Sequence, residues 1–310
     1  MAENSDHMQQ EVNDDFPAPM SPESEEQQVE ASEATNGGGG DDGDGGLNDS
    51  APEQQTQADT PPAEDKELKP EDQMRLYVWA GDDHRGLGDD VHCQQIYMIL
   101  TLKSEVNKMA KFQVITENIH IKKSQEFDKL AVNKLPCLVD PVGDRVISDV
   151  QTIVDYLEQV FKEPCLIPNK KSLQQVGIDL YRKFTGYLKN TNPHKEEEMK
   201  NALNRELEKL NRALVNSGGK FLDGDHLTQP DLRILPRLHH IVVAGKIFKG
   251  FEIPDDEAKY GRLKQYLDDW HQEDVYQETK YSDRDLEFGW YKTRGLDRMY
   301  IKGKGGYRLK

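Results

Sequence analysis

The sequence is poor in apolar residues and has no long hydrophobic run. Hydrophobic residues make up 35% of the 310 positions, and the mean hydropathy is −0.84. A helix that crosses a bilayer needs about 20 consecutive apolar residues. The nearest approach is Ile96–Leu102, which Lys103 and Glu105 follow at once. The acidic N-terminus also lacks the apolar segment of a signal peptide. We therefore exclude a protein built on ordinary membrane spans and expect no secretory signal.

Cysteine is scarce, and the usual motifs of metal and nucleotide chemistry are absent. The three cysteines, Cys93, Cys137 and Cys165, are an odd number without the pair spacing of a metal site. This excludes a disulfide-rich secreted scaffold and favours a reducing compartment. The sequence has no Walker A loop, no glycine-rich dinucleotide turn and no His-Glu-x-x-His motif. We therefore assign no metal ligand and expect a cytoplasmic protein.

The formal net charge of −17 comes from one end of the chain. Residues 1–73 hold 21 acidic and 2 basic side chains and therefore carry a charge of −19. Residues 74–310 hold the other 36 acidic and 38 basic side chains and carry +2. The acidic segment has one aromatic residue and cannot bury enough apolar surface to offset its chain entropy, which predicts a disordered tail. Such a tail either keeps the protein soluble or binds a partner. The near-neutral remainder gives no support for nucleic-acid binding.

The length of the remainder predicts two domains and a second tail. Residues 74–310 exceed the usual size of a single domain. The end of the chain is basic and rich in glycine, which is typical of a frayed terminus. The predicted parts are an acidic tail at 1–73, a first domain at 74–165, a second domain at 172–281 and a basic C-terminal tail at 282–310.

The first domain shows the pattern of a mixed sheet with helices. Alternation and helical periodicity predict strands at 75–80, 112–119, 135–139 and 145–148, and helices at 93–102, from Ser124 onward and at 149–161. A strand–helix–strand start makes a parallel pair, and the tight turn at 141–144 makes the last two strands antiparallel. This order predicts an α/β thioredoxin-like domain. Pro136, at the head of the third strand, is where this fold carries a cis peptide.

The second domain is predicted to be all helical, with helices over 176–189 and 195–216. Its sharpest local motif is the spacing of Thr228 and Asp231, which is that of an N-capping box, with Pro230 in the first turn. We interpret this motif as the structural start of a buried helix.

Several segments resemble the chloride intracellular channel (CLIC) proteins, a branch of the glutathione transferase superfamily near the omega class. They are Asn133–Cys137, Phe184–Pro193, Lys220–Thr228, Leu235–Ile241 and Gly250–Pro254, within a likeness that covers about residues 75–278. The resemblance implies a glutathione transferase fold, in which an all-α domain follows the thioredoxin-like one. It also implies a cytoplasmic form, a membrane-associated form and a link to chloride transport.

The family's reactive cysteine begins the first helix of the thioredoxin-like domain. On the resemblance, Asp90-Val-His-Cys93 occupies that motif, so Asp90 replaces the first cysteine, which we take as the invertebrate type, and Cys93 stands at the last position. A helix N-terminus stabilises a thiolate or a carboxylate, but only a thiol forms a mixed disulfide with glutathione. Cys93 is therefore the one candidate catalytic residue, and we favour a non-enzymatic protein.

The resemblance also implies a partial glutathione site. The backbone of Leu135, before the cis Pro136, would pair with the peptide, and Asp149 and Val150 would face its γ-glutamyl end. Val150 stands where a hydroxyl residue is common, which removes one hydrogen bond. Glutathione is thus the one cofactor that the sequence suggests. Four aspartates between residues 82 and 90 also make calcium binding worth testing.

Three functions stay open at this point. The first is a CLIC-like protein that associates with or inserts into membranes, with lipids as partners and a homo-oligomer in the membrane. The second is a glutathione-dependent thiol oxidoreductase or transferase that uses Cys93. The third is a non-enzymatic scaffold for membrane or cytoskeletal proteins.

Overall fold

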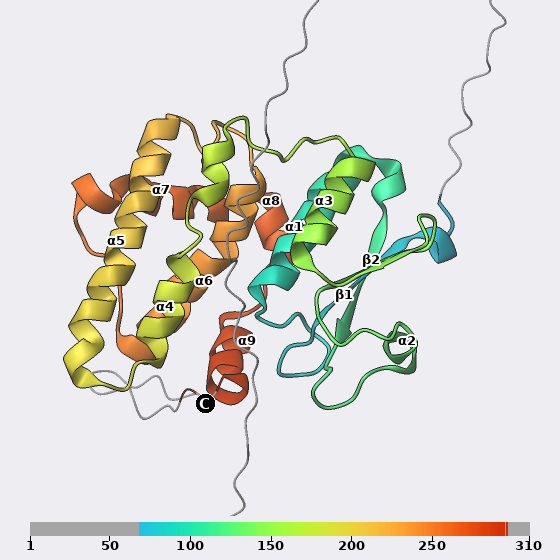
Figure 1. The fold of residues 1–310 in the computed structure, drawn as a ribbon, viewed down its shortest axis with the longest axis horizontal. Helices are drawn as coiled ribbons and strands as arrows, with labels where there is room; N and C mark the ends of the chain where they lie inside the picture. Colours follow the sequence, from blue (N-terminus) through green and yellow to red (C-terminus); the bar gives the residue numbers. More distant parts are fainter. Residues whose placement is uncertain (1–67, 295, 297–310) are drawn as a thin grey trace, which may run out of the picture. The chain divides into compact units, whose positions relative to one another are not determined.

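The structure, a computed structural model, describes residues 68–294 and 296 (Figure 1). Most of the predicted acidic tail and the end of the predicted basic tail lie outside these residues. The described part of the acidic segment forms a short 3₁₀ turn, η1 (Pro70–Asp72), that leads directly into the first strand.

A four-stranded mixed sheet forms the thioredoxin-like domain. Its strands are β1 (Met74–Trp79), β2 (Phe112–Glu117), β3 (Cys137–Asp140) and β4 (Arg145–Ile147), in the spatial order β2-β1-β3-β4. β1 is parallel to β2 because a helix crosses over between them, whereas β3 is antiparallel to both β1 and β4. The predicted thioredoxin-like arrangement is therefore confirmed, and the Leu135–Pro136 peptide before β3 is cis.

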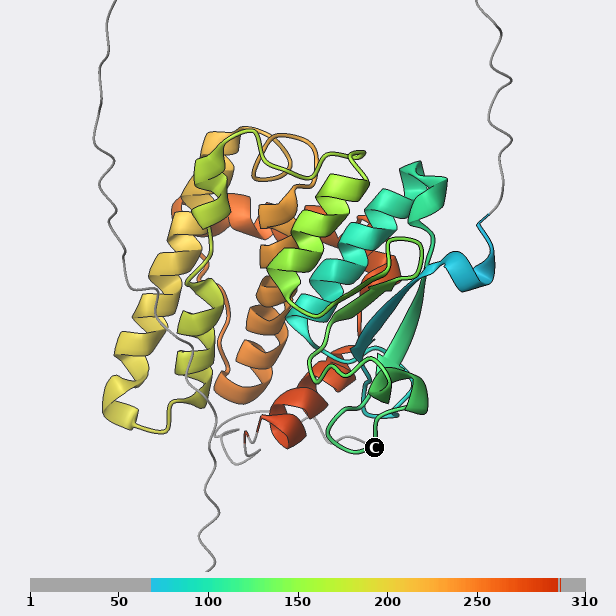
Figure 2. The ribbon, with the colours of Figure 1, turned by 45° about the vertical axis from the view of Figure 1, so that its right-hand side comes forward.

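Helices pack on both faces of this sheet (Figures 1 and 2). They are α1 (Val91–Val106), followed by the turn η2 (Lys108–Ala110), α2 (Gln125–Asp128) and α3 (Val150–Val160). Side chains of β1 alternate between the faces. Leu76 and Val78 join the main core with α1 and α3, whereas Tyr77 packs on Phe127 of α2, with ring centroids 5.2 Å apart.

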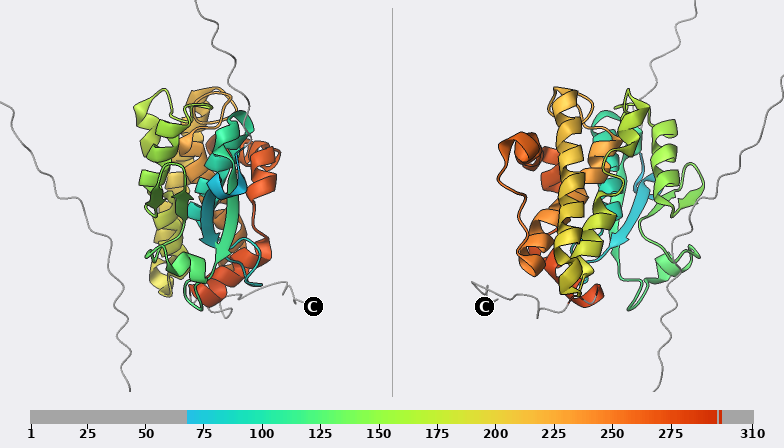
Figure 3. Two further views of the ribbon diagram at one scale, coloured as in Figure 1. Left: turned by 90° about the vertical axis from the view of Figure 1, so that its right-hand side faces the viewer. Right: turned by 60° about the vertical axis from the view of Figure 1, so that its left-hand side comes forward.

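The second domain is all helical (Figure 3). Its elements are η3 (Lys171–Gln175), α4 (Leu180–Lys189), α5 (Pro193–Ser217), α6 (Gln229–Lys249), α7 (Glu257–His271), α8 (Asp274–Thr279), α9 (Asp283–Phe288) and the π turn η4 (Gly289–Thr293). α6 lies at its centre, since it packs against α1, α4 and α9. Fourteen of its residues are buried, which is typical of a helix that is covered on every side.

Two segments differ from the sequence prediction. The helix expected from residue 176 begins at Leu180, because Gly177 has a left-handed φ of +69° and lies against Ile234. The basic tail expected from residue 282 is corrected for residues 282–294, which form α9 and η4. Leu286 and Trp290, four residues apart on one helical face, are buried there. The prediction of a tail rested on the charges of this segment and did not include this apolar pair.

The capping box at the start of α6 is the centre of a buried network. One carboxylate oxygen of Asp231, Oδ2, accepts hydrogen bonds from the backbone N–H and the hydroxyl of Thr228, at 3.0 and 2.7 Å. The other, Oδ1, accepts from the Leu222 N–H and the Tyr266 hydroxyl, at 3.0 and 2.8 Å. The predicted motif thus joins α6 to α7 and to the loop before α6, in addition to beginning the helix.

We expect Asp231→Ala to lower the free energy of unfolding by about 3 kcal/mol or more, because it leaves buried donors without an acceptor. Asp256→Ala is the matched control, since Asp256 caps α7 from the surface by accepting from the Lys259 N–H. It should cost about 1 kcal/mol. Urea unfolding of both variants measures the difference, and equal losses would contradict the network.

Candidate functional site

Two neighbouring cavities open where the loop after β1 meets the loop after β2. The larger, about 710 Å³, is lined by residues of the 79–90 and 118–121 segments and of the C-terminal segment 285–294. The smaller, about 410 Å³, is bordered by residues 133–135 and the start of α3. Trp79 and His120 line both cavities, with ring centroids 4.8 Å apart. Both volumes suit a small ligand.

Asp90 lines the larger cavity and is the N-cap of α1. Its Oδ1 accepts hydrogen bonds from the backbone N–H groups of His92 and Cys93, at 3.1 and 2.8 Å. A carboxylate is stabilised at this position because unpaired N–H groups and the positive end of the helix dipole meet there. The position that the resemblance assigns to the reactive cysteine therefore holds a group that completes the helix.

Cys93 lies one turn further on and lines neither of these cavities. Its side chain is buried between β1 and the end of α8, beside Val78, Tyr97 and Thr279. Burial, together with the nearby Asp90 carboxylate, raises the pKa of the Cys93 thiol well above its ordinary value. The thiolate is the nucleophilic form of cysteine, so this environment opposes a catalytic role for Cys93.

The other residues of the implied glutathione site gather at the smaller cavity. Leu135, Asp149 and Val150 line it, and the buried Pro136 adjoins them through the cis peptide. Asp149 caps α3: its Oδ1 accepts from the hydroxyl and the backbone N–H of Thr152, at 2.7 and 2.8 Å, and these bonds hold the pKa of Asp149 below its ordinary value. Asp90 borders the larger cavity, so the implied site is divided between the two hollows.

An ion pair that the sequence did not indicate closes the larger cavity from the C-terminal side. Both Asp89 oxygens face the Arg294 guanidinium, at 2.5 and 3.3 Å, and that guanidinium lies 4.8 Å from the centroid of the Trp290 ring. At Gly289 a Cβ atom would clash with the Asp89 carboxylate, so a larger residue there would have to displace that carboxylate. Asp89 and Arg294 are 205 positions apart, and no local pattern connects them.

His240 of α6 is buried and joins Asp89, just before α1, to Trp290 of the C-terminal segment. Its Nε2 donates to the Asp89 carbonyl at 2.8 Å, and its Nδ1 accepts from the indole N–H of Trp290 at 3.0 Å. Burial keeps the pKa of His240 well below its ordinary value, so the ring is neutral, as both hydrogen bonds require. The C-terminal segment is thus tied to the start of α1 through the backbone and the side chain of Asp89.

The aspartates between residues 82 and 90 do not converge on a cation. Asp83 accepts from the N–H groups of Arg85 and Gly86, while Asp89 and Asp90 have the partners described above. Across residues 68–294 and 296, three or more histidine, cysteine or acidic side chains nowhere come together as a metal site would require.

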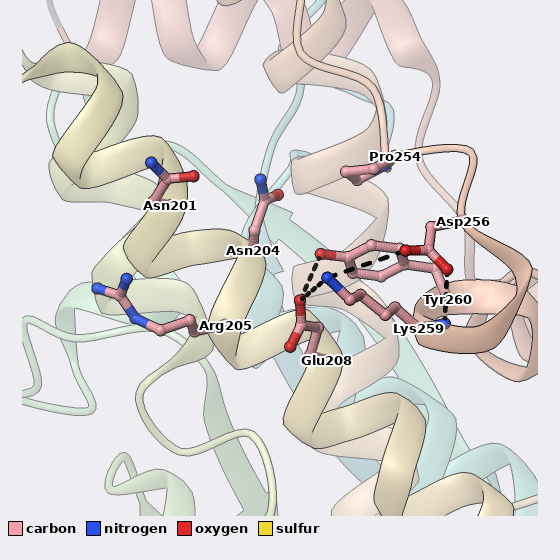
Figure 4. Close-up of a pocket in the computed structure, with 8 residues that line it drawn as sticks. All are labelled: Asn201, Asn204, Arg205, Glu208, Pro254, Asp256, Lys259 and Tyr260. Carbon is pink, nitrogen blue, oxygen red and sulfur yellow. Dashed lines mark hydrogen bonds and ion pairs between the residues drawn. The ribbon is translucent and has the colours of Figure 1, made fainter.

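A third hollow, about 340 Å³, lies between α5 and α7 in the helical domain (Figure 4). Three of its charged side chains, Glu208, Asp256 and Lys259, lie close to one another. Glu208 accepts from the Tyr260 hydroxyl at 3.2 Å and lies 3.7 Å from the Lys259 ammonium, which is also 3.9 Å from Asp256. We assign no ligand to it.

Comparison with known proteins finds a family match for the first part of the chain and structures that share the fold of both parts. Residues 72–164 match the sequence model of the CLIC-like N-terminal domain. The CLIC homologue EXC-4 from C. elegans has a similar structure, with a TM-score of 0.64 and 23% identity over 77% of this chain and 90% of that one. Dehydroascorbate reductase from Chlamydomonas reinhardtii has a TM-score of 0.61 and 23% identity, over 70% of this chain and 97% of that one. Glutathione transferase Omega 3C from Trametes versicolor has a TM-score of 0.55 and 17% identity, over 70% of this chain and 92% of that one. These structures establish the glutathione transferase fold.

Asp89 should make stability depend on pH. Burial raises the pKa of its carboxyl from 3.8 to about 6, although Arg294 opposes this shift. A carboxyl with a higher pKa in the folded state binds protons more tightly there, so the free energy of unfolding falls as pH rises between these two values. The shift corresponds to about 3 kcal/mol. Urea unfolding measures this dependence. In Asp89→Asn, the fall in the free energy of unfolding across this pH window should be smaller than in wild type by about 3 kcal/mol.

Asp83→Asn is the control for this measurement. The exposed Asp83 carboxylate accepts backbone hydrogen bonds that keep its pKa low, so it titrates below the window. This variant should retain the wild-type slope. An unchanged slope in Asp89→Asn would show that Asp89 is ionised at acid pH and that the ion pair outweighs the cost of burial.

Proposed function

We propose that the chain is a CLIC-like protein that associates with membranes and supports chloride transport, because residues 72–164 match the CLIC-like N-terminal domain and the fold is that of the glutathione transferases. It has a cytoplasmic form and a membrane-associated form, with lipids and further copies of the chain as partners in the membrane. The observation that carries this proposal over an enzymatic one is the Asp90 cap at the start of α1, where thiol exchange with glutathione would need a cysteine.

Conduction requires a rearrangement under this proposal. No helix in the described part of the chain combines the length and the apolar character that crossing a bilayer demands. α1 is the longest helix of the first domain, but it contains Lys103, whose ammonium is fully buried. That ammonium lies 3.1 Å from a Glu158 oxygen and donates to the carbonyls of Phe161 and Pro164 at 2.8 and 2.7 Å. Insertion of α1 must therefore begin with its release from α3 and α6.

Cys93 does not support the enzymatic alternative, because its thiol is buried and its raised pKa keeps it protonated. Of the three cysteines only Cys165 is exposed. The scaffold alternative, with cytoskeletal partners, stays a prediction.

Thiol labelling tests this assignment directly. In the folded protein, a thiol reagent should modify one cysteine rapidly, Cys165, and Cys165→Ser should abolish the fast phase, whereas Cys93→Ser should leave it unchanged. Cys93 should react only after unfolding. A fast reaction of Cys93, together with glutathione-coupled disulfide reduction that Cys93→Ser removes, would establish the enzyme instead.

Chloride release tests the transport part. Purified full-length protein added to chloride-loaded vesicles that contain anionic lipid should release chloride above the level given by heat-denatured protein. The Cys93→Ser and Cys165→Ser variants should release it at the same rate as wild type. Protein that sediments with the vesicles without releasing chloride would contradict conduction while leaving membrane association intact.

A further inference from the structure

We propose that the loop between β2 and α2, residues 118–123, is the surface with which this protein docks on anionic lipid (Figure 1). The inference rests on the membrane association proposed above and assigns it to particular side chains.

Ile121 is the apolar anchor of this loop. Its side chain is 72% exposed, the highest value among the large hydrophobic residues that the structure describes. The turn that presents it is already formed. The Ile121 N–H donates to the side-chain and backbone oxygens of Asn118, at 3.3 and 3.2 Å, and the Lys122 N–H donates to the same backbone oxygen at 3.1 Å. Docking therefore pays little further entropy to order the loop.

Lysines surround this anchor. Lys122 and Lys123 follow it directly, and Lys123 donates to Asn133, which places it beside Lys134. Lys292 borders the larger cavity together with Ile121. Within residues 68–294 and 296, no carboxylate lies at ion-pair distance from these four lysines, although Lys134 contributes to the low pKa of Asp149, which lines the smaller cavity with it. The charges of Lys122, Lys123 and Lys292 are therefore available to a ligand.

The acidic groups nearby do not cancel this charge. Segment 118–134 holds four lysines against Glu126 and Asp128, which leaves +2. The carboxylates that line the larger cavity are buried or half-buried and are engaged by arginines or by N–H groups. They are Asp82, Asp89, Asp90 and Asp285.

The size of the feature favours a lipid surface over a protein partner. A specific protein interface buries about 800 Å² on each side around an apolar core, whereas this loop offers one exposed apolar side chain among cations. A bilayer interface requires only that pair of features, because lysines are attracted to the anionic leaflet while apolar groups enter the headgroup region.

Val142 provides an internal comparison. It is 63% exposed on the tight turn between β3 and β4, but no lysine adjoins it there: Asp140 is buried, and the exposed Asp144 is followed by the exposed Arg145. An exposed apolar side chain thus occurs once with an excess of lysines around it and once without, and the second loop should not bind an anionic surface.

Flotation of the full-length protein with vesicles of phosphatidylcholine, alone or mixed with phosphatidylserine, tests the proposal. Wild-type protein should bind the mixed vesicles more tightly. Ile121→Ser should weaken that binding about 10-fold, and Val142→Ser should leave it unchanged. Lys122→Ala and Lys123→Ala should each weaken it about 5-fold, with a smaller effect at high salt. Equal thermal unfolding of the variants checks that the fold is intact.

The outcomes separate this inference from the proposed function. Tight binding by wild type that Ile121→Ser and the lysine variants do not alter would overturn the docking surface but preserve membrane association. Loss of binding in Val142→Ser to the same extent would also overturn it, since any exposed valine or isoleucine would then suffice. Failure of wild type to bind either kind of vesicle would remove membrane association itself, and the docking surface with it.

Discussion

The burial of α1 on all sides is the constraint on which the rest of the structure depends. The sheet covers one side of this helix, and α6 and α8 of the second domain cover the other. Ten of its sixteen residues are buried, including polar ones, which is why its apolar residues do not keep to one stripe. The two domains therefore share one hydrophobic core. Even Lys103 is fully buried in this core. Its ammonium is tolerated there because a carboxylate and two carbonyl oxygens surround it.

Two consecutive aspartates at the start of α1, Asp89 and Asp90, have different structural roles. Asp90 satisfies the free N–H groups of its own helix, which is a local role. Asp89 holds the C-terminal segment through Arg294 and, by its carbonyl, through His240. Where a thiol enzyme of this fold would place a nucleophile, the chain thus has a cap and an ionic closure. The contacts of both aspartates there are electrostatic, and Asp89 and Asp90 line the larger of the two cavities.

Local signals explain what the sequence could predict. Alternation gave the strands, the proline at the head of β3 indicated the cis peptide, and the Thr228–Asp231 spacing identified the start of α6. The contacts that close the site could not be predicted in this way. Asp89 and Arg294 meet only because α9 and η4 fold back along α6, and the charges of that segment suggested a tail. The burial of Cys93 likewise depends on Thr279 and Tyr281, at and just after the end of α8, which lie far away in the sequence.

Docking and conduction therefore make different demands on this fold. The loop that carries Ile121 lies outside the shared core, so contact with a lipid surface needs no change in α1. Insertion needs the opposite, because it must separate α1 from α6 and expose Lys103 and the Asp89–Arg294 pair. The cost of exposing that core is the larger of the two, since burial of apolar area and of paired charges holds it closed. Under the proposed function, a membrane-bound protein with the closed fold is thus a distinct state that would precede a conducting one. The acidic segment 1–73 adds −19 to the chain and opposes that first contact with anionic lipid by charge alone.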